Sequence, residues 1–312
     1  MATTVADATT VAEIEQASLE QLGNTHIDEV LVLLDHGLER LPSYRELYLR
    51  WERQQWKTQD LDFTQDKLDY ERLQAEYSEE MLEQTRKTNA SFWIGEHQVT
   101  VDLLPFVLAA PDTEQKLFLT TQVVDEARHM VFFDRYYTEV VGSVGEDLHT
   151  RIFDEKPHVY RAYDDIFFGT LAKLADDMRK DPENYELLVR GVTVYHIVIE
   201  GFLALTGQRF NLDYSKREDV FPGFRAGFTA IMRDESRHIT FGTKFLYDAV
   251  HEDPKWGAVI TDQLMQTLPL SLTLISDGDP TLFGFTQEEI NDWALRSLDK
   301  RLRVIGVPNP LG

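Results

Sequence analysis

The five-residue stretch DEARH occupies residues 125–129, and a near copy, DESRH, occupies residues 234–238. Each lies in the middle of a long run in which apolar residues recur every three or four positions, a pattern that indicates an amphipathic helix. A Glu and a His three residues apart lie on one face of a helix and can reach the same metal ion. The two matching pentads therefore predict a pair of metal-binding helices.

A Glu in strongly apolar surroundings precedes each pentad by one predicted helix. Glu96 lies in SFWIGEHQV at 91–99, and Glu200 lies in YHIVIEGFL at 195–203. One Glu from each of two helices and a Glu-x-x-His from each of two others is the ligand set of ferritin-like di-iron and di-manganese bundles. The sequence thus predicts two metal sites with bridging pentad carboxylates, formed by Glu96, Glu126 and His129 and by Glu200, Glu235 and His238.

The pentads also supply candidates for the groups that orient the two histidines. A metal-bound His needs its second ring nitrogen fixed by an acceptor. Asp125 and Asp234 are expected to accept that proton, each from the His of the facing helix. The alternative is a metal-free core in which the pentad arginines neutralise Glu96 and Glu200. Four buried carboxylates converging on two His would be destabilising without cations, which favours the metal sites.

The sequence contains two further Glu-x-x-His pairs, at 146–149 and 155–158. The first follows Gly142 and Gly145 in an apparent loop, and the second has Pro157 inside it. A proline inside a helix removes a hydrogen bond and crowds the preceding turn, so a helical ligand pair is not expected there. We predict that neither pair binds the metals.

The chain as a whole indicates an all-α protein with a ferritin-like four-helix bundle core and additional flanking helices. Proline and glycine separate the long helix-forming segments, and no series of short alternating runs indicates strands. We expect one domain over 1–312, with its metal-binding core at about 65–250 and a disordered start at 1–10. The predicted helices span 12–22, 27–54, 65–109, 113–141, 159–179, 184–209, 223–250, 254–272 and 287–303.

Composition excludes several classes of site and partner. Among its 312 residues the chain has no Cys, which leaves only His and carboxylates as metal ligands. With 54 acidic against 31 basic residues, the net charge of −23 disfavours a nucleic-acid partner. The first Lys or Arg is Arg40, and the longest stretch without a charged residue, 263–276, is too short for a membrane span. We therefore expect a cytoplasmic protein.

The order Glu, Glu-x-x-His, Glu, Glu-x-x-His, with both pentads in D-E-x-R-H form, resembles the ribonucleotide reductase small-subunit superfamily over roughly 65–250. In its radical-bearing members a Tyr stands seven residues after the Glu of the first Glu-x-x-His, where this chain has Phe133. The segment 303–312 also lacks the Tyr-bearing tail with which such subunits dock on their large subunit. Both departures argue against a standard reductase role.

Val99, three residues after Glu96, and Tyr195, five before Glu200, are similar to the Val and Tyr that form an ether cross-link in the ligand-binding oxidases of this superfamily. The resemblance implies a heterodinuclear cofactor, with manganese at the Glu96 site and iron at the Glu200 site; a di-iron centre is the alternative. It also implies O2 as oxidant, a long-chain fatty acid bound in an apolar tunnel and a homodimer. The electron donor is not specified.

The function expected from this resemblance is that of an oxidoreductase, a dinuclear oxidase that activates O2 for two-electron oxidation. The first alternative is a ribonucleotide reductase small subunit that generates a radical for a partner. The second, from another class, is an iron-handling ferritin-like protein. The lack of Cys excludes the Cys-ligated iron that rubrerythrins commonly add, and storage ferritins are much shorter.

Overall fold

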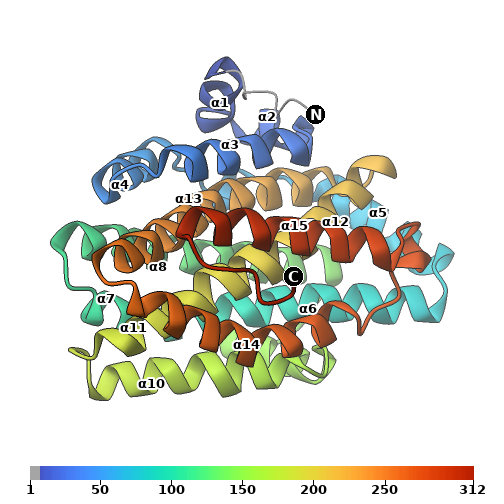
Figure 1. Cartoon of the computed structure of the whole chain (residues 1–312). Coiled ribbons are helices and arrows are strands. Elements are labelled where there is room, and N and C mark those ends of the chain that lie inside the picture. Colours follow the sequence, from blue (N-terminus) through green and yellow to red (C-terminus); the bar gives the residue numbers. More distant parts are fainter. Residues whose placement is uncertain (1–7) are drawn as a thin grey trace.

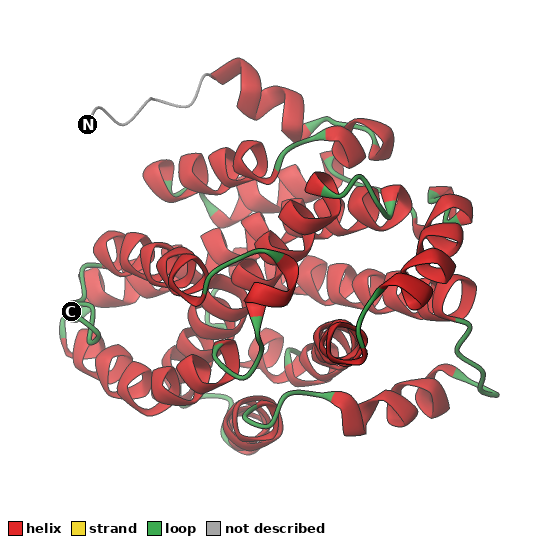
Figure 2. Cartoon of the chain, turned by 90° about the vertical axis from the view of Figure 1, so that its right-hand side faces the viewer, coloured by secondary structure: helices red, strands yellow, loops and turns green. Residues whose placement is uncertain are grey.

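The computed structural model describes residues 8–312. Of the start predicted to be disordered, 1–7 lie outside the described part, whereas 8–10 belong to the first helix. Within that part Figure 2 shows helices joined by loops and no strand. Here η denotes a 3-10 or π-helix. The elements are α1 Ala8–Glu15, α2 Leu19–Asn24, α3 Ile27–Arg40, α4 Tyr44–Arg53, η1 Thr58–Asp60, α5 Thr64–Glu76, α6 Glu79–Asp102, α7 Leu104–Ala109, α8 Thr113–Tyr136, η2 Tyr137–Val141, α9 Leu148–Glu155, η3 Lys156–His158, η4 Asp164–Leu171, α10 Ala172–Lys180, α11 Tyr185–Val192, η5 Thr193–Ala204, α12 Leu205–Arg217, α13 Pro222–Glu252, α14 Lys255–Ile275, η6 Pro280–Phe283 and α15 Gln287–Ile305.

Four long helical segments form the central bundle: α6, α8, α13 and the continuous run α11–η5–α12. α8 packs against α6 and α13, and η5 packs against α13. In Figure 1, α1 to α4 cover this bundle at the top, and α10 and α14 cover it at the bottom. The prediction of an all-α, ferritin-like fold with additional flanking helices is therefore confirmed.

The first turn of α13 is fixed by two carboxylates from α5. Asp66 accepts hydrogen bonds from the backbone N–H groups of Gly223 (2.8 Å) and Phe224 (2.6 Å), and Asp69 accepts one from Phe221 (2.9 Å). Carboxylates at a helix N-terminus satisfy free N–H groups and complement the helix dipole. Burial raises the pKa of Asp66 to about 6, against the lowering effect of these bonds. This cap anchors the helix that carries the second pentad.

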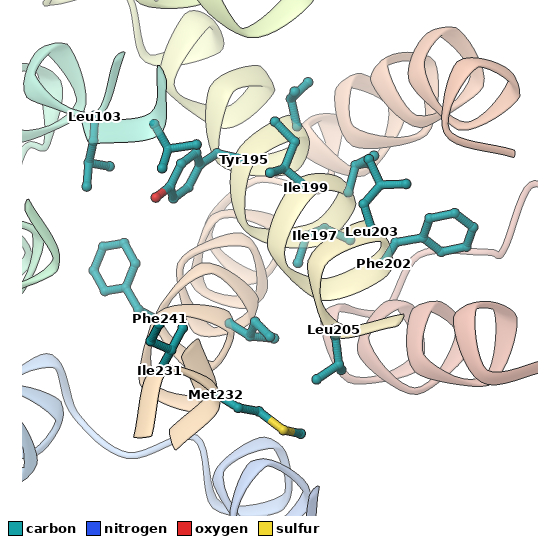
Figure 3. Packing of buried hydrophobic residues seen from close by; sticks show 14 of the residues in the cluster. Leu103, Tyr195, Ile197, Ile199, Phe202, Leu203, Leu205, Ile231, Met232 and Phe241 are labelled. Atoms are coloured by element: carbon teal, nitrogen blue, oxygen red, sulfur yellow. The ribbon is translucent and has the colours of Figure 1, made fainter. Parts of the chain in front are cut away.

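The segment predicted as one α-helix at 184–209 contains a π-helix, η5, between α11 and α12. Figure 3 shows apolar side chains leaving η5 on several sides, as expected of a helix inside a core. Tyr185–Arg217 is also the one helix in the described part that is long and apolar enough to cross a membrane. However, 83% of its most apolar window is buried inside the protein, so it is a core helix here.

The backbones of η5 and α13 approach closely at Gly242. A Cβ added to Gly242 would lie 2.1 Å from the Cβ of His196, a separation that real side chains do not reach. Any larger residue would push the two helices apart. Because η5 and α13 both carry predicted metal ligands, this contact helps to set the distance between them.

Candidate metal centre

All six predicted ligands converge in the middle of the bundle, and each is at most 7% exposed. Their potential ligand atoms form two groups, each with all atoms within 4.8 Å of one another. Glu126 and Glu235 belong to both groups, as bridging carboxylates would. The groups are Glu96, Glu126, His129 and Glu235, and Glu126, Glu200, Glu235 and His238.

Both histidines direct Nδ1 at the carboxylates. Nδ1 of His129 lies 3.4 Å from Glu96 and 3.5 Å from Glu235. Nδ1 of His238 lies 3.3 Å from Glu235 and 3.5 Å from Glu200. Each imidazole therefore presents the same ring nitrogen to the space that the carboxylates surround.

The other ring nitrogen of each His faces an Asp of the opposite pentad. Nε2 of His129 lies 3.4 Å from Asp234, and Nε2 of His238 lies 3.1 Å from Asp125. An acceptor at Nε2 fixes the proton there and leaves Nδ1 free to bind a cation. The crossed arrangement ties α8 and α13 together across the centre.

The pentad arginines pair with these aspartates. Arg237 Nη2 donates to Asp125 and to Asp234, at 2.8 Å each, and Arg128 Nη2 donates to Asp234 at 2.9 Å and also pairs with Asp125. Burial alone would raise the pKa of Asp234, but Arg237 and Arg128 hold this pKa well below its ordinary value. The arginines are thus occupied, so the alternative in which they neutralise Glu96 and Glu200 does not fit the structure.

Two tryptophans also bind these aspartates, and neither was predicted from the sequence. The indole N–H of Trp51 donates to Asp125 (2.9 Å), and that of Trp56 donates to Asp234 (2.8 Å). Both come from α4 and the segment after it, far from the pentads in sequence. No local spacing links them to a metal site, so only the three-dimensional structure identifies them.

Gln122 is a further polar residue of the centre that sequence reasoning missed. Its amide N–H donates to Glu200 (2.8 Å), and its carbonyl oxygen lies 3.1 Å from Nε2 of His196. Gln122 stands four residues before Glu126 and therefore on the same face of α8. That four-residue spacing is the feature of the sequence that could have identified Gln122 as part of the centre. Gln122 orients Glu200 from the opposite side of the bundle.

Charge balance within the centre is unusual for a protein core. Burial raises the pKa of Glu96 to about 8, and burial together with Glu235 raises that of Glu200. Against the effect of burial, the carboxylates raise the pKa of both His129 and His238 well above its ordinary value. The carboxylates of the cluster thus favour positive charge within it, on the two imidazoles or on bound cations.

The donor set fits a pair of first-row divalent metals. Among the described residues, His129 Nδ1 and Glu200 Oε2 are buried and make no hydrogen bond. Unpaired buried polar atoms are costly unless something else binds them. Imidazole and carboxylate together suit iron and manganese, and the carboxylates offset the charge of two such ions.

The π-helix η5 brings Tyr195 to the same side as Glu200. In an α-helix, residues five apart point about 140° away from each other. The wider turn of a π-helix, which pairs residue i with residue i+5, brings them onto one face. The Tyr195 hydroxyl accordingly donates to Glu126 (2.8 Å).

A cavity of about 180 Å³ extends from the centre through the bundle. Val99 and Tyr195 both line it, together with the four carboxylates of the centre. The rest of its wall is mostly apolar and includes Phe92, Phe167 and Leu203, while Gln84 and Thr88 lie on its wall farther along α6. The cavity therefore combines an apolar wall with a group of acidic side chains.

The two remaining Glu-x-x-His pairs take no part in either ligand group of the described residues. Glu146 is exposed, and Glu155 forms an ion pair with Arg86 (3.0 Å). Phe133, at the position of the reductase tyrosine, packs among phenylalanine rings, with centroids 5.1 Å from Phe132 and 5.9 Å from Phe228. The surroundings of Phe133 are thus apolar.

Comparison with known proteins agrees with this geometry. The family model described as ribonucleotide reductase, small chain, matches residues 40–310. Among solved structures, a valine-to-isoleucine variant of an R2-like ligand-binding oxidase with anaerobically reconstituted Mn/Fe cofactor is 26% identical, with a TM-score of 0.73 over 84% of this chain and 93% of that one. A tyrosine-to-phenylalanine variant gives the same values. With aerobically reconstituted cofactor, the valine-to-isoleucine variant is 25% identical, with a TM-score of 0.73 over 84% and 94% of the two chains.

Proposed function

The chain belongs to the ribonucleotide reductase small-chain family and is an oxidoreductase with a dinuclear metal centre, and from this we propose that it is an O2-activating Mn/Fe oxidase. We propose Glu96, Glu126 and His129 as ligands of manganese and Glu200, Glu235 and His238 as ligands of iron. The observation that carries the proposal is the pair of ligand groups sharing Glu126 and Glu235. When bound, the two metals would reduce O2 and so provide an oxidant that can accept two electrons.

The proposed reaction joins Val99 to Tyr195 through an ether bond. The Val99 Cβ–H and Tyr195 O–H bonds break, a Cβ–O bond forms, and O2 accepts the two electrons and two protons. The chain's own contribution is positional: Tyr195 is held by its hydrogen bond to Glu126, and Val99 is buried one turn after Glu96. The cavity wall keeps water from the reacting C–H bond.

We also propose a long-chain fatty acid as the ligand of the cavity. An apolar wall suits an alkyl chain, and metals at the carboxylate end would bind an acidic head group. Extraction of the purified protein with organic solvent, followed by mass spectrometry, is expected to release one fatty acid per chain. The proposal includes a cytoplasmic location, and in the structure the apolar segment Tyr185–Arg217 is mostly buried as a core helix.

The test is to add Mn(II) and Fe(II) in air to the metal-free protein and to compare its mass before and after. We expect the loss of two hydrogen atoms, with the peptides of Val99 and Tyr195 joined. The same addition without O2 is the control and should leave the mass unchanged. Full metal uptake in air without any change of mass would leave the dinuclear centre in place but contradict the cross-link.

The reductase alternative is less well supported because Phe133 stands in apolar surroundings at the position of the reductase tyrosine. Ribonucleotide reduction on addition of a large subunit would restore it. The iron-handling alternative predicts a large cage, which light scattering would detect.

We further propose that two copies of the chain associate through α8. Leu117, Val124 and Val131 are exposed and seven residues apart, so they form one stripe along the outer face of α8. A seven-residue apolar repeat is typical of helices that pack side by side. Thr120 and Ala127 alternate with them, and this stripe carries no charge. Between two copies of a chain of net charge −23, an uncharged face avoids adding repulsion at the contact.

Val124→Lys is expected to convert the dimer into a monomer. It places two like charges in the middle of the proposed contact, which costs several kcal/mol and weakens association by about a hundredfold or more. Sedimentation equilibrium measures the change. Val144→Lys, the same substitution at a residue that is 84% exposed in a loop, is the control. A Val124→Lys protein that remains dimeric would exclude this face as the contact.

A further inference from the structure

Arg301, on α15, is a fully buried arginine without a carboxylate partner among the described residues. Its side chain is 1% exposed, Nη2 donates to the carbonyl oxygen of Gly201 and to Ser297 Oγ (2.7 Å), and Nε has no partner. Burial lowers its pKa to about 9, against the effects of Asp35 and Glu200. Holding a charge in this place is costly, which suggests a role beyond packing.

The carbonyl that Arg301 binds lies next to a proposed metal ligand, Glu200, at a change of helix type. In an α-helix the N–H of Leu205 would bond to the carbonyl of Gly201. Here, the N–H of Leu205 bonds instead to the carbonyl of Glu200, five residues earlier. The carbonyl of Gly201 accepts from Arg301 and from Ser297 Oγ (3.1 Å), both on α15.

Gly201 leaves just enough space for this contact. A Cβ on Gly201 would lie 2.6 Å from Nε of Arg301 and 2.8 Å from Cζ. Even Ala would therefore push the guanidinium away from the helix. Glycine at this position thus leaves free the space that the guanidinium occupies.

The π-helical winding of η5 determines which of its side chains face the metal centre. Tyr195 and Glu200 share a face only while η5 is wound as a π-helix. In that state Tyr195 donates to Glu126 (2.8 Å) and Glu200 accepts from Gln122 (2.8 Å). Long π-helices are rare and need support from outside the helix, because an α-helix pairs its own groups better. Arg301 and Ser297 provide such support, because they donate to the Gly201 carbonyl from outside the helix.

We infer that Arg301 is a positioning residue: through the Gly201 carbonyl it holds the π-helical register of η5 that presents Glu200 and Tyr195 to the metal centre. The inference rests on the proposed function, in which Glu200 is a metal ligand. Its distinctive consequence is selective. Loss of Arg301 should weaken mainly the site that contains Glu200, because Glu200 is the one proposed ligand on η5, whereas Glu96, Glu126 and His129 lie on α6 and α8.

The test is anaerobic titration of metal-free protein with Mn(II), which counts the ions bound and the affinity of each step. Wild type is expected to bind two ions per chain. Arg301→Met keeps the length of the side chain and removes its donors, so we expect one step unchanged and the other weakened by about 10–100-fold. Arg301→Lys, which retains a charged donor, should recover most of the second step. Arg296→Met, on the exposed side of α15, is the control.

Two further measurements keep the inference open to refutation. Hydrogen exchange on the metal-free proteins should be faster in peptides of η5 in Arg301→Met than in wild type, a readout that needs no activity. If Arg301→Met does not fold, the Mn(II) titration is repeated with Ser297→Ala, and we expect its second binding step to be weakened by about 2–10-fold.

The outcomes separate this inference from the proposed function. A wild-type protein that binds no Mn(II) would overturn the proposed function itself. Wild type with two ions, and Arg301→Met with the same two affinities and the same exchange in η5, would overturn the role of Arg301 alone. Equal weakening of both steps in Arg301→Met would mean that Arg301 supports the fold in general, and would also overturn the positioning role.

Discussion

Glu235→Ala is expected to leave the protein without tightly bound metal. Glu235 belongs to both ligand groups, and its two oxygens lie 3.5 Å from Nδ1 of His129 and 3.3 Å from Nδ1 of His238. The substitution therefore removes a ligand from both proposed sites at once. The loss should exceed the ~10–100-fold that removal of an outer-shell partner causes. Metal content after loading and desalting, by plasma emission spectroscopy, measures it.

The same variant should fold at least as well as wild type when both are metal-free. Burial raises the pKa of Glu235, with Glu126 adding to the effect. A carboxyl group whose pKa is raised by folding stabilises the folded protein at low pH and loses that contribution as pH rises. Removing Glu235 should therefore raise the thermal unfolding temperature of the metal-free protein most clearly at pH values above its raised pKa, where the buried group would have to carry a charge.

Glu146→Ala provides the matched control, because Glu146 also stands three residues before a His but is exposed and outside both groups. It should bind metal as wild type does. Unchanged metal content in Glu235→Ala would exclude the proposed ligand set. A metal-free Glu235→Ala protein that unfolds at a lower temperature than wild type would contradict the account of the carboxylate charges.

The sequence was sufficient for the fold and for the convergence of six polar side chains because the relevant signals are local. Glu126 and His129 lie on one face at helical spacing, and so do Glu235 and His238. The repetition of the pentad then predicts that two such helices face each other. The crossed contacts of Asp125 and Asp234 follow from the same symmetry, since a metal-bound His needs an acceptor behind it.

The π-helix could not be predicted, because the apolar residues at 193–204 surround the helix on all sides and leave no periodic stripe to count. A uniformly apolar segment reads the same whether it is wound as an α-helix or as a π-helix. Trp51 and Trp56 were missed for a different reason. Their partners are 74 and 178 residues away, and contacts at such separations depend on how the helices pack.

The register of η5 also explains why two residues five apart belong to one site. The spacing of Tyr195 and Glu200 was noted in the sequence only through a resemblance, since an α-helix would separate them by about 140°. In the structure the tyrosine hydroxyl reaches Glu126 and both residues line one cavity. A tyrosine hydroxyl therefore lies next to the proposed centre, whereas Phe133 has no hydroxyl to offer.

Tyr195→Phe is expected to bind both metals and to form no cross-link. Tyr195 is in neither ligand group, and its hydroxyl makes one hydrogen bond, to Glu126. Loss of that bond should cost only about 0.5–1.5 kcal/mol, so the fold and the ligands remain. The phenyl ring lacks the oxygen that the ether requires. Peptide mass spectrometry after addition of Mn(II) and Fe(II) in air should find the peptides of Val99 and residue 195 separate.

Tyr163→Phe distinguishes this loss from a general effect of removing a hydroxyl from the cavity. Tyr163 also lines the cavity and is buried, but its hydroxyl donates to the backbone carbonyl of Ser91 (3.0 Å) and not to a carboxylate of the centre. This variant should still lose two hydrogen atoms on treatment with metals and air. If Tyr163→Phe loses the cross-link and Tyr195→Phe retains it, the oxidised tyrosine is Tyr163. If both variants retain it, oxidation by this centre joins a different pair of residues.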